Sequence, residues 1–200
     1  DAEVAQGGGD LHDLEGNELA ARRRSGHDGP MLPCPTPTRP AGARLRPLRP
    51  GDAPALLDAY RSADDMARQG TVTTPAQARQ QVAWLLEADR RATAIVDGND
   101  TLIGLVALTI DREDRIGWFF YWLHAAHRGQ GLAVQAAAAV AERALAPSAE
   151  GGWGLERLEL GHRANNPASG AVARAAGFVH EGTERGKFLI DGRRVDVLTY

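Results

Sequence analysis

A change in sequence character near residue 42 limits what this chain can fold into. Residues 1–42 contain no Trp, Tyr, Phe or Ile, carry the run Gly7-Gly8-Gly9, and hold five prolines between Pro30 and Pro40. A segment of this kind cannot bury enough apolar surface to offset the entropy lost on ordering. We therefore predict a flexible N-terminal extension over residues 1–42, either an added or processed segment or a docking segment, and one folded domain over residues 43–200.

From Ala43 onward, short strand-like runs alternate with capped helices, which is the pattern of a mixed α/β domain. Thr74, Pro75 and Gln77 fit a capping box that begins a helix. Asp191-Gly192 separates the last two strand-like runs and predicts a tight hairpin. The expected strands cover 44–48, 94–96, 102–108, 116–123, 155–160, 178–190 and 194–200. The expected helices follow Asp52 and Thr74 and cover 131–146 and 167–176.

Composition excludes several classes of function. The chain has 200 residues and a formal net charge of -3, so it has no general attraction to nucleic acid or to an anionic membrane. Its alanine-rich run at 136–141 is far shorter than the roughly 18 to 20 apolar residues that span a bilayer. The single cysteine, Cys34, has no partner for an internal disulfide or a zinc site. We expect a cytoplasmic monomer or homodimer that binds no metal, nucleic acid or membrane.

The stretch from Tyr121 to Ala133 joins a strand to a helix through a short loop that holds Gly129 and Gly131. The first backbone N–H groups of such a helix have no partner within the helix, and the helix dipole adds partial positive charge there. A pyrophosphate fits this geometry, although a glycine pair before a helix is also ordinary turn chemistry. The chain has no Gly-Lys-Ser/Thr loop for a nucleoside triphosphate, and Val134 stands where a dinucleotide fingerprint has its third glycine.

Further motifs follow the glycine loop in a fixed order. The signature Arg/Gln-x-x-Gly-x-Gly/Ala is matched by Arg128-Gly129-Gln130-Gly131-Leu132-Ala133. An Asn-x-x-Ser pattern at Asn166 and Ser169, then Gly177-Phe178 and Glu181-Gly182, complete the set. On these motifs, residues 43–200 resemble the GNAT superfamily of N-acetyltransferases. The run Tyr121-Trp122-Leu123-His124 is most similar to the branch that acetylates the N-termini of ribosomal proteins.

The resemblance implies a strongly twisted central sheet of six to seven strands flanked by four helices. It also implies that two parallel strands at the centre, 118–124 and 155–162, splay apart around the pantetheine arm of acetyl-CoA. The cofactor's phosphates are then assigned to backbone groups of the loop, and the pantetheine to the strand end and Asn166. The cofactor-binding residues implied in this way are Trp122, Leu123, His124, Arg128, Gly129, Gln130, Gly131, Leu132, Ala133, Asn166 and Ser169.

The resemblance also implies a catalytic role for Ser169, placed to protonate the departing CoA thiolate, which is a fair leaving group because of its thiol-like pKa. The general base is left open, since related sequences often carry a glutamate where this chain has Trp118. His162 and Glu159, on opposite faces of the neighbouring strand, are the candidates for a base that acts directly or through water. A helix-capping role for Asn166 and a packing role for His162 are the structural alternatives.

The function implied is direct transfer of an acetyl group from acetyl-CoA to a primary amine in a ternary complex. The acceptor is either a peptide or protein N-terminus or a small amine-bearing molecule. An α-amine with a pKa near 7.7 is about one-sixth neutral at pH 7, which costs roughly 1 kcal/mol, whereas a lysine-like amine costs about 4.6 kcal/mol. Cys34 lies far from every motif, so a covalent cysteine intermediate is not expected. The alternative is a non-catalytic acyl-CoA-binding module that regulates or docks a partner.

Overall fold

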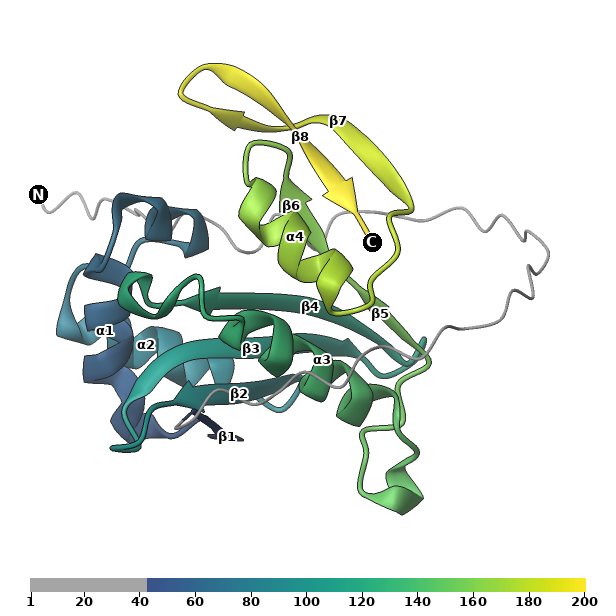
Figure 1. The fold of residues 1–200 in the computed structure, drawn as a ribbon, viewed down its shortest axis with the longest axis horizontal. Helices are drawn as coiled ribbons and strands as arrows, with labels where there is room; N and C mark the ends of the chain where they lie inside the picture. Colours follow the sequence, from purple (N-terminus) through teal and green to yellow (C-terminus); the bar gives the residue numbers. More distant parts are fainter. Residues whose placement is uncertain (1–42) are drawn as a thin grey trace, which may run out of the picture.

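The computed structural model describes residues 43–200, and the extension predicted over residues 1–42 lies outside the described residues (Figure 1). The predicted mixed α/β fold is confirmed. The α-helices are α1 (Ala53–Arg61), α2 (Pro75–Leu85), α3 (Leu132–Leu145) and α4 (Pro167–Ala175). The 3-10 turns are η2 (Pro50–Asp52), η3 (Asp64–Gln69), η4 (Ala125–His127) and η5 (Ser148–Glu150). The strands are β1 (Arg44–Pro47), β2 (Arg90–Val96), β3 (Leu102–Asp111), β4 (Ile116–Leu123), β5 (Arg157–Glu159), β6 (Gly161–Arg163), β7 (Gly182–Ile190) and β8 (Arg193–Thr199). None of these helices combines the length and the apolar character needed to cross a bilayer.

The strands form two sheets, in place of the single sheet of six to seven strands that the resemblance implies. Five strands pair in the order β1-β2-β3-β4-β5, and three pair in the order β6-β8-β7. β4 and β5 are parallel, but only 116–118 pair with 157–159. The strand implied over 155–162 is divided into β5 and β6 because Leu160 exchanges two backbone hydrogen bonds, of 3.0 and 2.8 Å, with Tyr200.

β4 and β6 diverge beyond this interruption. β6 pairs antiparallel with β8, while the C-terminal half of β4 continues along β3. Gly161 lies where the two strands separate, and a Cβ atom there would come within 3.2 Å of Cη2 of Trp118 and 3.1 Å of Cγ1 of Val197. Because Gly161 has no side chain, the indole of Trp118 on β4 can lie directly against β6.

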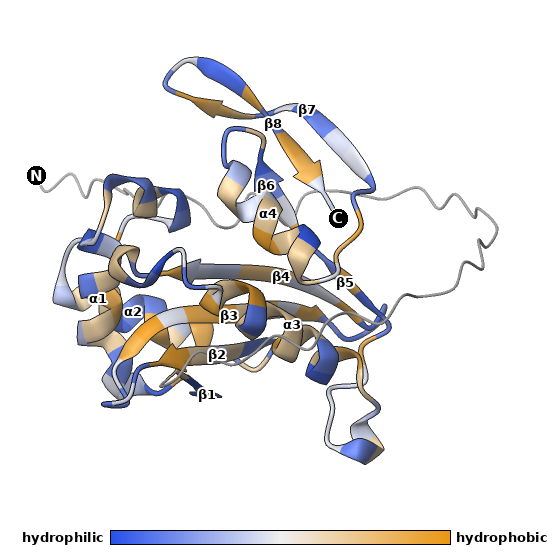
Figure 2. Cartoon of the chain, in the orientation of Figure 1, coloured by the Kyte–Doolittle hydropathy of each residue, from blue (hydrophilic) through white to orange (hydrophobic). Residues whose placement is uncertain are grey.

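Two apolar clusters cover the two faces of the five-stranded sheet, and hydrophobic residues concentrate in its central strands (Figure 2). Along β4 the side chains alternate between these clusters, as period-two geometry predicts. Phe120 and Trp122 pack in the cluster formed with α1 and α2, whereas Phe119 and Leu123 pack in the cluster formed with α3. Both faces of this strand are covered, since Phe119 is 1% exposed and Trp122 is 5% exposed.

The predicted capping box begins α2. The backbone N–H of Gln77 donates to Oγ1 of Thr74 at 3.2 Å, and the backbone N–H of Thr74 donates to Oε1 of Gln77 at 3.0 Å. Two backbone donors that the helix itself cannot pair are satisfied in this way. The local sequence therefore fixes the start of α2 without help from distant residues.

The C-terminal hairpin turns where the sequence predicts. Asp191 and Gly192 both have positive φ, 49° and 73°, as a tight hairpin turn requires. β7 begins at Gly182, later than the predicted start at residue 178. Phe178 is instead placed by its ring, which packs 5.2 Å from the ring of Phe119 between the centroids.

A mostly buried ion pair ties β1 to the start of α1. Nη1 and Nη2 of Arg46 donate to the two carboxylate oxygens of Asp52 at 2.8 and 2.7 Å, and the two side chains are only 10% and 9% exposed. Nε of Arg46 also donates to Asp100 at 3.0 Å. Burial alone would raise the pKa of Asp52, but hydrogen bonds from Arg46 and from the backbone N–H of Arg49 hold this pKa below its ordinary value.

We predict that Asp52→Asn lowers the free energy of unfolding at pH 7 by about 2 to 3 kcal/mol, because Arg46 loses a charged hydrogen-bond partner. The folded-state pKa of Asp52 is depressed, so its contribution is present above the unfolded pKa near 4 and is lost as the pH falls through the folded value. Urea unfolding at pH 7 and at pH 3 should therefore give a smaller difference between parent and variant at pH 3. The exposed Asp114→Asn is the matched control and should change stability little; a difference for Asp52→Asn that is the same at both pH values would contradict the assignment.

Candidate functional site

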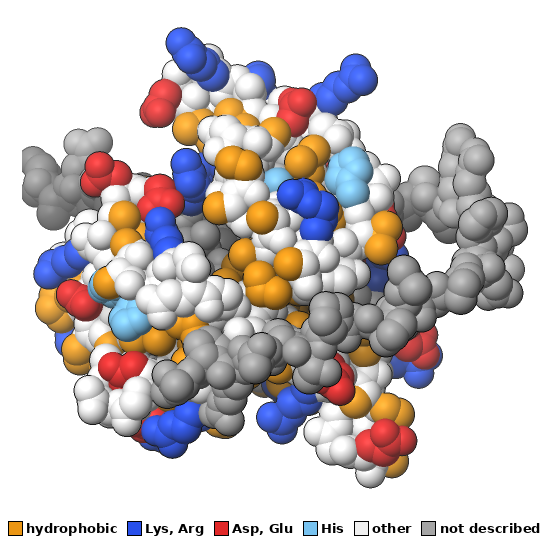
Figure 3. Space-filling model, in the orientation of Figure 1, with side chains coloured by type: hydrophobic (Ala, Val, Ile, Leu, Met, Phe, Trp, Pro, Cys, Tyr) orange, Lys and Arg blue, Asp and Glu red, His pale blue; other side chains and the backbone are white. Residues whose placement is uncertain are grey.

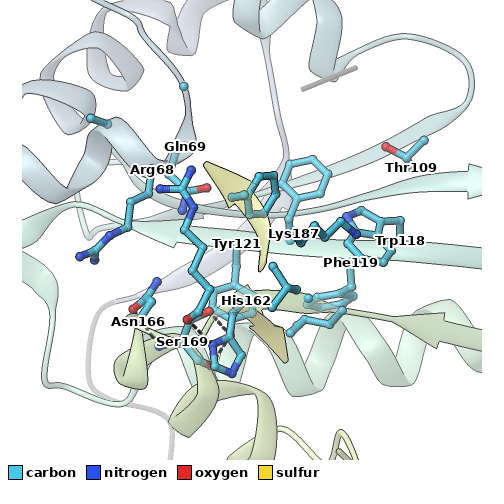
Figure 4. Close-up of a pocket in the computed structure, with 18 of the residues that line it drawn as sticks. Arg68, Gln69, Thr109, Trp118, Phe119, Tyr121, His162, Asn166, Ser169 and Lys187 are labelled. Carbon is cyan, nitrogen blue, oxygen red and sulfur yellow. Dashed lines mark hydrogen bonds between the residues drawn. The ribbon is translucent and has the colours of Figure 1, made fainter. Parts of the chain in front are cut away.

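The divergence of β4 and β6 opens a cavity of about 560 Å³. Its walls come from β4, β6, the start of α4, η3 and β7. In Figure 4, Arg68, Asn166 and Ser169 lie on one side of the cavity, and Trp118 and Phe119 lie on the other. The molecular surface is hollowed beside α4 (Figure 3). The splayed strands thus leave room for a ligand that an intact sheet would exclude.

The glycine loop follows β4 and ends where α3 begins. Gly129 and Gly131 both have φ of +74°, a conformation that glycine adopts at little cost. A Cβ atom at Gly129 would meet no heavy atom within 4 Å, so the backbone there is open to an approaching group. Gln130 completes the loop, and Leu132 and Ala133 begin the helix of 14 residues. The loop therefore has the geometry of an anion site at a helix N-terminus.

The side chain of Arg128 is bound to η3. Its Nη1 lies 3.0 and 2.9 Å from the two carboxylate oxygens of Asp65, and its Nη2 lies 3.2 Å from the sulfur of Met66. Its Nε donates to the carbonyl of Leu123 at 3.3 Å. Arg128 therefore offers a ligand its backbone, while its guanidinium anchors the loop.

Two further contacts hold the loop to α1 and the turn after it. Nδ1 of His124 accepts from the backbone N–H of Ala126 at 3.1 Å, and Nε2 of His124 lies 3.3 Å from Oδ2 of Asp58. The backbone N–H of Ala125 donates to Oγ of Ser62 at 3.0 Å. We call the His124–Asp58 and Ala125–Ser62 contacts, together with the Arg128–Asp65 pair, the loop clasp. Sequence reasoning did not identify it, because its acidic and hydroxyl partners lie about 60 residues earlier in the chain.

The side chains of Trp122 and Leu123 pack in the core and do not line the cavity. The Trp122 ring packs edge-on against Tyr60 at 5.8 Å between centroids, and Leu123 is buried on the α3 side. Gly104 on β3 makes this arrangement possible, since a Cβ atom there would lie 2.6 Å from Cδ1 of Leu123 and 2.9 Å from the carbonyl of Trp122. The pantetheine contacts implied for these residues are therefore restricted to main-chain groups.

Asn166 and Ser169 lie together at the N-terminus of α4. Oδ1 of Asn166 accepts from the backbone N–H of Ser169 at 3.3 Å, which is a helix cap. Oη of Tyr121 on β4 donates to the carbonyl of Ser169 at 2.6 Å and lies 3.0 Å from its Oγ. Since the one phenolic proton is used at the carbonyl, Oγ of Ser169 is the donor in the second contact.

Tyr121 is the site residue that sequence reasoning missed. Period-two alternation places it on the α3 face of β4 and suggests only a core role. Burial raises its pKa to about 12, so its phenol stays protonated across the physiological range. An aromatic residue with a hydroxyl, on the strand that faces the predicted serine, was the signal available in the sequence.

His162 lines the cavity but has both ring nitrogens engaged. Nδ1 lies 3.0 Å from the carbonyl of Arg163, and Nε2 lies 3.3 Å from Oη of Tyr200, which also accepts from Nη1 of Arg174 at 3.1 Å. The residue is 6% exposed and lies under Gly170 of α4, where a Cβ atom would come within 2.6 Å of Nε2. Its hydrogen bonds position β6, β8 and α4 relative to one another.

Glu159 lies apart from the other predicted site residues. Its Oε1 accepts from Nε of Arg157 at 2.8 Å, and Arg157 also pairs with Glu181. The cavity walls do not include Glu159. The structure thus brings Asn166, Ser169 and His162 to one cavity and leaves Glu159 in a partly exposed ion-pair cluster. Within residues 43–200, no group of three or more His, Cys, Asp or Glu side chains is arranged to hold a metal ion.

A comparison with protein families finds a match over most of the described chain. A family model described as an acetyltransferase (GNAT) domain matches residues 43–179. A search of curated proteins found no match.

Solved structures share the fold at low sequence identity. The ribosomal-protein-S5-alanine acetyltransferase of Vibrio fischeri matches with a TM-score of 0.67 and 21% identity, over 81% of this chain and 93% of that one. The dodecameric spermidine N-acetyltransferase of Vibrio cholerae matches with a TM-score of 0.61 and 23% identity, over 80% and 92% of the two chains. A ribosomal L7/L12 alpha-N-protein acetyltransferase in complex with coenzyme A matches with a TM-score of 0.66 and 21% identity, over 84% and 96%. At these identities the likeness shows the fold.

We predict that Tyr121→Phe lowers the free energy of unfolding by about 1 kcal/mol, because the carbonyl of Ser169 loses its hydrogen-bond donor. Ser169→Ala leaves that bond intact and should cost less. Urea unfolding of both variants measures the two values. A larger loss in Ser169→Ala than in Tyr121→Phe would contradict the donor assignment.

Proposed function

Because the chain belongs to the GNAT acetyltransferase family, we propose that it transfers an acetyl group from acetyl-CoA to the primary amine of an acceptor, directly and within a ternary complex. The observation that carries this proposal is the junction of two features. A glycine loop with the geometry of an anion site follows the end of β4, and Tyr121 on the same strand lines a cavity together with Ser169.

The residues of the loop fit the pyrophosphate of acetyl-CoA. Gly129 and Gly131 have positive φ, and the N–H groups at the start of α3 would donate to a bound anion. Bound acetyl-CoA supplies an activated thioester. Trp122 and Leu123 would hold its pantetheine arm mainly through backbone groups along the open edge of β4. Asn166, at the start of α4, would hold the arm as well.

Ser169 is proposed to protonate the departing thiolate. Its Oγ–H donates to Oη of Tyr121 at 3.0 Å, so the hydroxyl is already oriented within the cavity and can rotate to a sulfur atom. Tyr121 holds the Ser169 carbonyl and thereby fixes the position of the serine at the start of α4. Tyr121 is therefore a positioning residue in this proposal.

No dedicated carboxylate base is needed for an α-amine. Its neutral fraction at pH 7 is about one-sixth, at a cost of roughly 1 kcal/mol. This favours a peptide N-terminus as acceptor over an amine of higher pKa. His162 and Glu159 remain predictions as bases, and the contacts that engage their polar atoms favour structural roles for both.

Acetyl-CoA binding should depend on the glycine at position 131. Gly131→Trp should abolish or weaken acetyl-CoA binding by at least about 100-fold, because a bulky residue at positive φ would displace the phosphate loop. The matched control is Gly151→Trp, which has φ of +83° and open space but lies after η5 at the far end of α3. Calorimetric titration of acetyl-CoA into the parent and both variants measures this. Absence of binding by the parent, or equal weakening in both variants, would contradict the loop assignment.

Turnover should depend on the side chain of Ser169. Ser169→Ala should lower kcat for acetyl transfer by about 100-fold, the lower range for loss of a general acid, with little change in acetyl-CoA affinity. Thiol release and mass spectrometry of the acceptor would report the rate. Tight acetyl-CoA binding without transfer to any amine would support a non-catalytic acyl-CoA-binding module instead.

A further inference from the structure

The charged residues that line the cavity all have the same sign. They are Arg68, Arg90, Arg163 and Lys187, and the lining contributed by the described part of the chain includes no Asp or Glu. A cavity of this kind stabilises a bound anion and opposes a bound cation. Only the charges that no neighbouring carboxylate offsets can act strongly on a ligand.

Two of the four are compensated by neighbours outside the cavity. Arg90 pairs with Glu87 and, at 3.0 Å, with Asp89. Nζ of Lys187 lies 2.7 Å from Oε2 of Glu184 on the same strand. These carboxylates offset most of the field of the two cations.

Arg163 and Arg68 are poorly compensated. Within residues 43–200, no carboxylate pairs with the guanidinium of Arg163, which lies 5.3 Å from the centroid of the Phe188 ring. Arg68 approaches Asp65 only at 3.5 Å, and the same carboxylate is already bound by Arg128 at 2.9 Å. Among the described residues, the only carboxylate paired with either of these two guanidinium groups is therefore that of Asp65, which lies near Arg68 and binds Arg128 more closely.

The electrostatics of Arg163 agree with this geometry. Burial lowers the pKa of Arg163, and the positive charge of Arg68 lowers it further. The two cations are therefore close enough to repel each other, and an anion between them would relieve the repulsion.

Arg163 is also fixed relative to the reacting groups. Its carbonyl accepts from the backbone N–H of Asn166 at 2.8 Å and faces Nδ1 of His162 at 3.0 Å. Ser169 follows three residues after Asn166, and Arg68 lies on the same side of the cavity as Asn166 in Figure 4. Both arginines thus line the same cavity as Asn166 and Ser169.

We infer that Arg163 and Arg68 bind a carboxylate of the acceptor, so that the substrate is a primary amine that also carries a carboxylate. This inference rests on the proposed function and narrows its substrate class. The carboxylate can belong to a free amino acid or to an acidic residue near a peptide N-terminus. A polyamine is disfavoured, because its positive charges would lie against four cationic side chains.

The same charges would assist the reaction. Positive groups near a bound ammonium lower its pKa and so raise the fraction that is neutral and nucleophilic. The acceptor's carboxylate secures binding, and the remaining cationic field favours loss of the amine proton. A cavity without a carboxylate base is consistent with this division of roles.

The test compares matched acceptors with the full chain and acetyl-CoA. L-phenylalanine is paired with its amide, and the peptide Glu-Ala-Ala-amide with Gln-Ala-Ala-amide, with spermidine as the cationic acceptor. We expect kcat/KM to be about 10- to 100-fold higher for the carboxylate member of one pair, the range for a hydrogen bond to a charged group. The pair that shows the preference identifies whether the carboxylate comes from a free amino acid or from a peptide.

Variants of Arg163 test whether this side chain causes the preference for carboxylate acceptors. Arg163→Gln should remove the preference by reducing kcat/KM for the carboxylate acceptor alone, and Arg163→Lys should restore part of it. The exposed Arg79→Gln, on α2 and outside the cavity, is the control that should change nothing. Thermal unfolding checks that each variant is folded, and calorimetry checks its affinity for acetyl-CoA.

The outcomes separate the two proposals. Equal turnover of carboxylate and amide acceptors, efficient turnover of spermidine, or loss of acetyl-CoA affinity in Arg163→Gln would overturn the carboxylate inference while leaving the transferase intact. If no acceptor is acetylated, titration of the same acceptors into the CoA-saturated protein shows whether the arginine pair binds a carboxylate. Carboxylate binding that is lost in Arg163→Gln would support the arginine site although the proposed transferase fails, and no such binding would overturn both.

Discussion

Leu160 exchanges its backbone hydrogen bonds with Tyr200, and the cavity depends on that exchange. Strands in a continuous sheet lie about 4.8 Å apart, which leaves no space between them for a ligand. After Trp118, the edge of β4 is released from its parallel partner, and its peptide groups must be satisfied by water or by a ligand. Gly161 and the Trp118 indole occupy the point of separation, so the local packing matches the change in pairing.

Much of the fold follows from local signals. The capping box at Thr74, the hairpin turn at Asp191 and Gly192 and the bounds of β4 all agree with the sequence. These features depend on residues close in the chain, and the chemistry of a cap or a tight turn is decided within about four residues. The interruption at Leu160 could not be predicted in this way, because its partner lies 40 residues away at Tyr200.

The residues of the candidate site are also of two kinds, those that local motifs predict and those whose role depends on distant parts of the chain. The glycine loop, Asn166 and Ser169 could be found from motifs, because their roles use backbone groups and fixed spacing. Tyr121 and Arg163 could not be found, since each gains its meaning from the element that folds against it. On sequence alone Tyr121 is one aromatic residue in an apolar strand, and Arg163 is one arginine among many.

The loop clasp links the glycine loop to η3, which forms part of the cavity wall. Asp65 and Met66 of η3 hold Arg128, while Ala67 and Arg68 of the same short turn face the cavity. A ligand that alters the loop would therefore act on the same short turn that contributes to the cavity wall. Coupling between binding free energies is reciprocal. If one substrate changes the affinity of the protein for a second substrate by some factor, the second changes the affinity for the first by the same factor. In the proposed ternary complex, a single guanidinium and its carboxylate, Arg128 and Asp65, would therefore couple the affinities of the two substrates.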